Sequence, residues 1–313
     1  MLDKKVMQFA NFNITFGNND KPMLEHLLDI IYPAFTSGIG KGTTKDNKRY
    51  IFQKVEIKLI SEDYYMVGNL IKDTIYHVST VMENGDLIQV DRFTPTSPYS
   101  RFIINLKNHR MILIKNESNS PDTRSFQSVV RSCLQKYINK INKEKTIKDK
   151  YPEALVNIVD IPFKENIDKE LAEASKIVSL TFRMFKPNKD MSYEPMIEAL
   201  HSRMKESETN SASVVLNNPK NKETVKQMMY SVGDLAEPSL RIKDKNGVGK
   251  RIRPENLTMK IQLEKLDRDI CSYEDSFFLD VAKTQGGGAI INASSENEDL
   301  YKLKTEALSK LLS

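Results

Sequence analysis

The stretch of residues 124–151 constrains the fold of this chain more than any other part of the sequence. Its apolar residues follow the three-then-four spacing that lays one stripe along a helix: Phe126, Val129, Val130, Cys133, Leu134, Tyr137, Ile138 and Ile141. Asp122 or Thr123 can cap the first turn, and Pro152 closes the segment. The pattern therefore predicts a long helix over the first two-thirds of the stretch, with a lysine-rich linker past Asn142.

The polar residues of the same stretch are mostly basic. It holds eight Lys and Arg residues and two carboxylates, and eight minus two gives +6, whereas the whole chain carries +5. Basic charge is therefore concentrated here. It fits either a solvated helix with a soluble linker or a surface that neutralises phosphates. In the second case we expect Arg131, Lys136 and Lys143 to contact nucleic acid.

Length and composition indicate a globular protein of two domains. A chain of 313 residues is long for one core, and the lysine-rich run before Pro152 is the natural place to divide it. No run approaches the roughly 18 apolar residues of a membrane helix, and the N-terminus lacks an apolar signal core, so we expect a cytoplasmic location. Cys133 and Cys271 have no companions at metal-ligand spacing, and no motif predicts a cofactor or a metal site.

The N-terminal domain, 1–150, reads as a mostly antiparallel sheet backed by two helices. Alternating apolar residues predict strands near 12–16 and 55–59, and a helix is expected from Pro22. Further strand-like runs cover 64–69, 86–90, 101–106 and 110–114, the last two joined by a turn short enough for a hairpin.

The C-terminal domain, 151–313, alternates strands and helices, so the predicted class is α+β throughout. Strands are expected at 155–159, 178–184, 213–216, 239–243, 257–263 and 273–281. Helices are expected at 166–174, 196–204, 222–235 and 296–312, with a glycine loop at 286–288. In the strand at 178–184, Val178, Leu180, Phe182 and Met184 are predicted to share one face.

A second basic cluster lies around the turn at Asn246 and Gly247. Six cations oppose Asp244 alone, and six minus one gives +5 over this hairpin: Arg241, Lys243, Lys245, Lys250, Arg251 and Arg253. An exposed basic β-ribbon suits a nucleic-acid groove or a phosphate backbone. A solvated hairpin with no binding partner would have the same sequence pattern. Because Trp is absent and aromatic residues are few, contact with a duplex backbone is favoured over stacking on single strands.

One pattern suggests catalysis instead. Glu56 and Lys58, two apart on a predicted strand, have the spacing found in many metal-dependent nucleases, where a carboxylate binds the metal and a lysine positions water. The additional acid would have to be Asp46, in a loop. Alternating charge on the wet face of a strand also produces this spacing, so the nuclease stays an alternative and we assign no catalytic residue.

The hairpin and the elements before it resemble the RexA family of phage exclusion proteins. The resemblance covers roughly 155–263 and rests on Ser239-Leu240-Arg241, Lys243-Asp244 and Gly247, after a strand at 214–216 and a helix that follows Pro219. It implies a two-domain α+β protein that binds DNA with little sequence preference, works as a homodimer and serves antiviral defence beside a membrane-embedded partner. The implied binding residues are Arg241 and Lys243.

The N-terminal half resembles a bacterial family of unknown function, DUF4747, in segments such as Ser100-Arg101-Phe102-Ile103-Ile104. Three hypotheses follow from the sequence. The first is a duplex-DNA-binding protein of antiphage defence, and the second is the metal-dependent nuclease. The third is an interaction protein whose basic surfaces bind an acidic partner or an anionic membrane.

Overall fold

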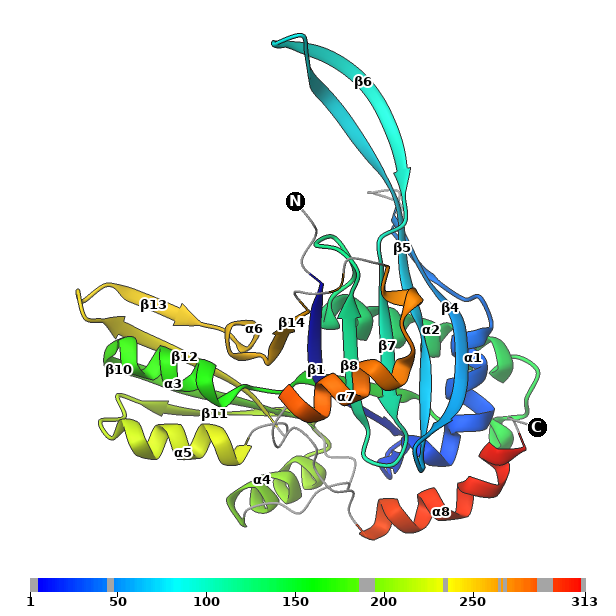
Figure 1. The fold of residues 1–313 in the computed structure, drawn as a ribbon. Coiled ribbons are helices and arrows are strands. Elements are labelled where there is room, and N and C mark those ends of the chain that lie inside the picture. The colour runs from blue at the N-terminus through cyan, green and yellow to red at the C-terminus, as the bar shows by residue number, and fades with distance from the viewer. Residues whose placement is uncertain are drawn as a thin grey trace.

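The computed structural model is an α+β protein built on two antiparallel sheets (Figure 1). It describes residues 5–43, 48–185, 195–232, 236–263, 266, 269–285 and 295–310. The α+β class predicted from the sequence is confirmed. No helix in these described ranges is long and apolar enough to cross a membrane.

The first sheet is large and curled, and all of its strand pairs are antiparallel. It contains ten strands in the order β14-β1-β8-β7-β5-β4-β3, with β2 and β9 paired to β1 and β6 paired to β5. Its strands are β1 (Val6–Phe16), β2 (Lys21–Pro22), β3 (Lys41–Thr43), β4 (Lys48–Ile60), β5 (Asp63–Glu83), β6 (Asp86–Thr96), β7 (Tyr99–Asn105), β8 (Arg110–Lys115), β9 (Ala154–Asp160) and β14 (Lys260–Gln262). Strands β9 and β14 both follow residue 150, so the predicted boundary does not separate the two sheets.

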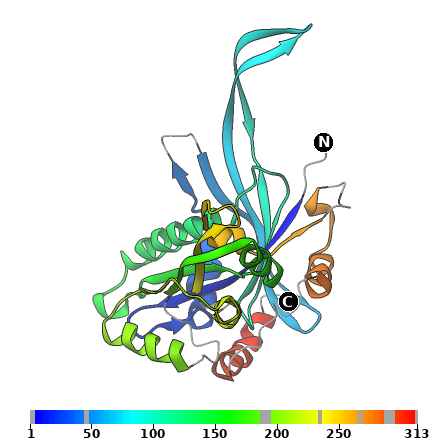
Figure 2. The same cartoon turned by 90° about the vertical axis from the view of Figure 1, so that its left-hand side faces the viewer.

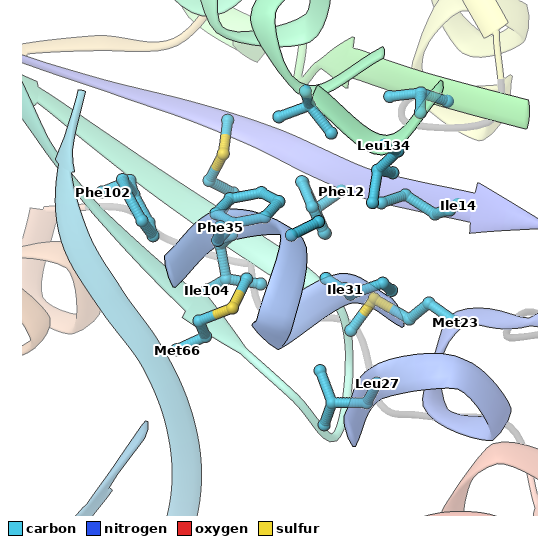
Figure 3. Packing of buried hydrophobic residues seen from close by; sticks show 14 of the residues in the cluster. Phe12, Ile14, Met23, Leu27, Ile31, Phe35, Met66, Phe102, Ile104 and Leu134 are labelled. Atoms are coloured by element: carbon cyan, nitrogen blue, oxygen red, sulfur yellow. The ribbon is translucent and has the colours of Figure 1, made fainter. Parts of the chain in front are cut away.

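One face of the first sheet carries the main core, because side chains alternate along each strand. Phe12 and Ile14 of β1 point to this face, whereas Met7 and Phe9 point to the other. The face is covered by η1 (Met23–His26), η2 (Leu27–Ile31), α1 (Tyr32–Thr36), α2 (Thr123–Asn142) and α8 (Ser295–Ser309). Phe35 of α1 stacks on Phe52 with ring centroids 4.2 Å apart, inside the aromatic cluster that Figure 3 shows in part.

The opposite face of the first sheet is covered by α7 (Asp275–Gln285), preceded by η4 (Ile270–Ser272). Figure 2 shows α2 and α7 on opposite sides of this sheet. Phe278 and Leu279 of α7 pack on the apolar side chains of β1, β5, β7 and β8 that point this way. The sheet is therefore sandwiched between two unequal helical layers.

Strands β5 and β6 extend beyond the sheet as a two-stranded arm (Figure 1). Pairing of β5 with β4 ends at Asp73, and pairing with β7 ends at Ile71. From Thr74 to Glu83, β5 pairs with β6 alone among the described strands. The sequence pattern indicated two short strands here and gave no sign that β5 continues for 21 residues.

The second sheet has four strands in the order β11-β10-β12-β13. They are β10 (Ala174–Phe185), β11 (Ser211–Asn217), β12 (Ala236–Asp244) and β13 (Gly249–Ile252). Its core contains side chains from α3 (Lys164–Glu173), α4 (Pro195–Glu206), α5 (Lys222–Val232) and α6 (Pro254–Leu257). The remaining element, η3 (Ile147–Asp149), lies in the lysine-rich connection before β9.

Several predicted elements are confirmed, one is wrong and one is shorter than predicted. Helix α2 begins where expected, because the Asp122 carboxylate accepts the Ser125 amide at 2.8 Å as its cap. The strand predicted at 273–281 is wrong: these residues enter α7, which Asp275 begins. The strand predicted at 257–263 is shortened to Lys260–Gln262, because α6 occupies 254–257. The glycine loop at 286–288 lies outside the described residues.

Candidate nucleic-acid interface

The second sheet has one covered face and one open face, and strand alternation decides which side chains reach each. On β12, Leu240 and Ile242 are buried, while Arg241 and Lys243 between and beside them are exposed. Leu180 and Phe182 of β10 are likewise buried in the core beneath the helices. The charged residues of these strands are therefore directed to the open face.

Strand register brings these cations together, because residues directly opposite each other in an antiparallel pair share a face. Arg241 lies opposite Arg251 of β13, and Lys243 lies opposite Lys176 of β10. Ser179 of β10 lies opposite Arg241, and Arg183, four residues further along β10, therefore lies on the same face. We call this surface the basic face, and its cations are Lys176, Arg183, Arg241, Lys243 and Arg251.

The basic face is nearly unopposed in charge. Glu237, opposite Arg183, is the carboxylate that shares it. Across the part of the chain that the structure describes, no acidic group forms an ion pair with Arg241, Lys243 or Arg251. Unpaired, exposed cations beside serine and threonine hydroxyls are the groups that bind phosphate oxygens.

The hairpin turn is held by its own side chains. The Asp244 carboxylate accepts hydrogen bonds from the amides of Asn246 at 2.8 Å and Val248 at 2.9 Å. Gly247 adopts a φ of +78°, a conformation that suits glycine. Lys245 stands exposed in this turn. The turn thus fixes the register that places Arg241 beside Arg251.

Two of the predicted hairpin cations do not belong to the basic face. Lys250 lies opposite Ile242, on the covered side, and its ammonium lies 2.7 Å from Glu170 and 3.4 Å from Glu173 of α3. The hydrogen bond to Glu170 raises the pKa of Lys250. Arg253 precedes α6 and its guanidinium lies 3.8 Å from Glu255. Local charge counting could not separate these residues from their neighbours.

The three cations of α2 that were predicted to contact nucleic acid lie on different parts of the helix surface. The Arg131 guanidinium donates to the carbonyl of Val156 in β9 at 3.0 Å, whereas Lys136 donates to the carbonyl of Gly40 at 2.8 Å, on the opposite flank of the helix. Lys143 is exposed at the C-terminal end. The residues therefore do not form one surface, and Arg131 is the one that approaches the second sheet.

A cleft of about 350 Å³ joins Arg131 to the end of the basic face. Gln127 and Arg131 of α2 line one side, and Arg183 and Glu237 of the second sheet line the other. Burial raises the pKa of the Glu237 carboxyl, although Arg183 opposes the shift. A salt bridge of 2.6 Å between Arg124 and Glu255 connects α2 to α6 nearby. The basic face and the start of α2 thus form a continuous surface.

The structure adds Lys176 and Arg183 to the residues predicted from the sequence. Arg183 could have been found, since it follows the alternation of the predicted strand at 178–184. Lys176 could not, because a β-bulge between Ile177 and Ser179 shifts the alternation. Ile177 is consequently buried in place of Val178, and Lys176 turns to the open face.

The residues of the nuclease alternative lie on the other side of the molecule, beside α7. The Lys58 ammonium is 3.5 Å from Glu56 and 3.1 Å from Asp275, whose carboxylate also accepts from Arg101 at 2.8 Å. Asp275 is buried, which opposes ionisation, but Arg101 and Lys58 hold the pKa of its carboxyl below the usual value. Lys58 therefore belongs to a structural ion-pair network.

The described residues contain no group of three or more His, Cys, Asp or Glu placed to hold a metal ion. Asp46, the acid that the nuclease hypothesis needed, lies outside them. A cavity of about 610 Å³ lies on the same side of the sheet, with an apolar floor that includes Phe9, Tyr65 and Ile112. Its rim carries both signs of charge, Asp63 and Glu62 with Lys107, Arg110 and Lys283.

The sequence matches the model of one known protein family over most of its length. Residues 5–247 match the family described as Domain of unknown function (DUF4747). The chain belongs to this family. No curated protein matches the sequence, so no named homologue supports the resemblance to RexA. The matched region of this DUF4747 member includes α2 and β12 and ends within the hairpin turn, before Arg251.

Proposed function

We propose that this DUF4747 protein binds the phosphate backbone of duplex DNA, with little sequence preference, through the basic face. The observation that carries the proposal is the cross-strand register, which places Arg241 opposite Arg251 and Lys243 opposite Lys176 on an open sheet surface. Backbone contacts of this kind supply affinity that does not depend on base sequence.

The composition of the basic face supports backbone contact over base stacking. The neutral positions of β10 and β12 between the cations are small and polar, for example Ser179, Thr181 and Ser239, and Val215 of β11, opposite Thr181, is an exposed apolar residue of the same face. Hydroxyl groups donate to phosphate oxygens and carry no sequence information. Within the described residues, Phe185 is the aromatic residue of this face, and it lies at one end. A single aromatic side chain is not enough to form a platform for base stacking.

Arg131 extends the proposed site across the cleft toward α2. A duplex lying along the basic face would pass the cleft, because Arg183 belongs to both. Lys245 in the hairpin turn and Arg253 before α6 are exposed, and in this proposal they add positive charge beside the basic face. Lys136, Lys143 and Lys250 contribute, in this proposal, only to the general positive field.

The biological setting is proposed on the RexA resemblance: a cytoplasmic protein of antiphage defence that acts with a membrane-embedded partner. In such a role DNA binding serves recognition or scaffolding, and the DNA stays intact. The ion pairs around Lys58 favour this reading over the nuclease, because the lysine is engaged with Asp275. This setting is separable from the DNA-binding proposal.

The test is binding to a random-sequence duplex, measured by fluorescence anisotropy with magnesium present and the DNA recovered afterwards on a gel. The test variant combines Arg241→Glu, Lys243→Glu and Arg251→Glu. We expect wild-type protein to bind and the variant to lose binding. Equal binding by the variant would refute the assignment of the basic face.

A matched control changes the same number of charges elsewhere. Lys54, Lys169 and Lys205 are exposed lysines of β4, α3 and α4, outside the basic face. The triple variant Lys54→Glu, Lys169→Glu and Lys205→Glu should retain most of the binding. Absence of binding by wild-type protein would instead point to an acidic protein or an anionic membrane as the partner. Cleaved DNA would support the alternative hypothesis of a metal-dependent nuclease that uses Glu56.

A further inference from the structure

The arm formed by residues 74–96 stands clear of the rest of the molecule (Figures 1 and 2). Among the described strands, β5 beyond Asp73 and β6 pair only with each other. Each therefore presents an outer edge of backbone amide and carbonyl groups with no neighbouring strand. Long exposed edges are sites where another chain can pair or pack.

The arm is also unusually apolar for an exposed structure. Half of the large apolar side chains that are exposed in the described residues lie within it: Ile75 at 44%, Tyr76 at 42%, Met82 at 75%, Leu87 at 75%, Ile88 at 40% and Phe93 at 65%. With side chains of roughly 200 Å² each, these fractions leave on the order of 600 Å² of apolar surface in water. This surface is divided between the two faces of the ribbon, because Ile75 and Tyr76, and likewise Leu87 and Ile88, are adjacent in their strands.

The charge of the arm favours a basic partner. Between residues 74 and 96 there are three carboxylates, Glu83, Asp86 and Asp91, and one cation, Arg92, so one minus three gives −2. The whole chain carries +5, so the remainder carries +7. An acidic arm has the wrong sign for nucleic acid or an anionic membrane. The basic remainder of a second copy has the right sign.

We propose that the arm of one copy packs against the body of a second copy, and that the second arm packs in return. A closed pair of this kind follows from two-fold symmetry, in which the same contact occurs twice. A stable interface needs about 800 Å² from each partner, and the apolar side chains of one arm, on the order of 600 Å², make up a large part of that area. The arm contains no residue of the basic face, and the pairing does not require bound DNA.

The test is sedimentation velocity on the full chain without nucleic acid, over a concentration series. Wild-type protein should show a reversible monomer–dimer equilibrium. The variant combining Met82→Asp and Leu87→Asp should raise the dimer dissociation constant at least ~30-fold, the effect of losing an interface hot spot. Its control is Ile147→Asp, which changes a side chain 87% exposed in η3 and should leave the dimer unchanged.

Circular dichroism and the melting temperature show whether the arm variant folds. The arm is exposed on both faces around these residues, so both should match wild-type protein. If the double variant does not fold, Phe93→Asp supplies the same test at another exposed arm position. A wild-type chain that stays monomeric throughout the series, or a folded arm variant that dimerises like the control, would overturn the proposal. Neither result would affect the DNA-binding test.

Discussion

Neutralising three cations of the basic face gives a quantitative test of backbone binding. The change is Arg241→Gln, Lys243→Gln and Arg251→Gln, which removes charge and keeps side-chain size and polarity. These residues are exposed and make no ion pair within the described chain, so the folded protein loses no partnered contact. We therefore expect the melting temperature to stay within the range of ordinary surface substitutions.

The magnitude follows from counterion release. Each phosphate contact contributes about −0.9 to the slope of log K against log salt concentration, so three lost contacts reduce the slope by ~2.7. Between 50 and 200 mM salt, a fourfold change, a slope difference of ~2.7 corresponds to about 40-fold. The advantage of wild-type protein over the variant should thus be about 40 times greater at the lower salt concentration.

The assay is fluorescence anisotropy on one random-sequence duplex at several salt concentrations, with protein from the same preparation. Lys54→Gln, Lys169→Gln and Lys205→Gln form the control, because they remove equal charge away from the basic face. Parallel slopes for wild-type protein and the test variant would refute the reasoning, even if the variant bound more weakly. A reduced slope in the control would show that net charge, rather than the register of β12 and β13, determines binding.

Two further predictions concern stability. Asp275→Asn leaves Arg101, whose side chain is only 11% exposed, without its anion and should cost about 3 kcal/mol at pH 7 by chemical denaturation. Because the folded pKa of Asp275 is lowered, its stabilisation is complete above the unfolded value of about 3.9 and is lost as pH falls through the folded pKa. The deficit of the variant should therefore shrink on acidification, and a constant deficit would contradict this account. Gly68→Ala places a Cβ 2.7 Å from Cζ of buried Phe102 and should cost roughly 1–3 kcal/mol, whereas Gly42→Ala, with open space around it, should cost less.

Local pattern was sufficient for elements whose burial repeats with one regular period. Most of the predicted stripe of α2 is buried, from Phe126 to Ile138, while Tyr137 and Ile141 are partly buried, and Asp122 caps the helix. The strand at 239–243 alternates as predicted within β12. In these segments the side chains that reach the core are fixed by helix or strand geometry alone.

Pattern failed where a distant residue decided the structure. Residues 273–281 are rich in aromatic and branched side chains, which favour a strand, yet they enter helix α7. Phe278 and Leu279 of that helix pack on the first sheet, and Asp275 at its start is held by Arg101 and Lys58. Tertiary contacts outweigh β-propensity, whose range is small. No residue pattern within 273–281 predicts those contacts.

In the candidate interface, too, some features follow from local sequence and others from tertiary contacts. The sequence by itself determined that basic residues concentrate around the hairpin and along α2. Tertiary structure decided which of them share a surface: the bulge in β10 turns Lys176 outward, and α3 captures Lys250. It also placed Arg131 and Lys136 on opposite flanks of one helix. Charge content is additive along a chain, but direction depends on register and on neighbouring elements, which only folding brings together.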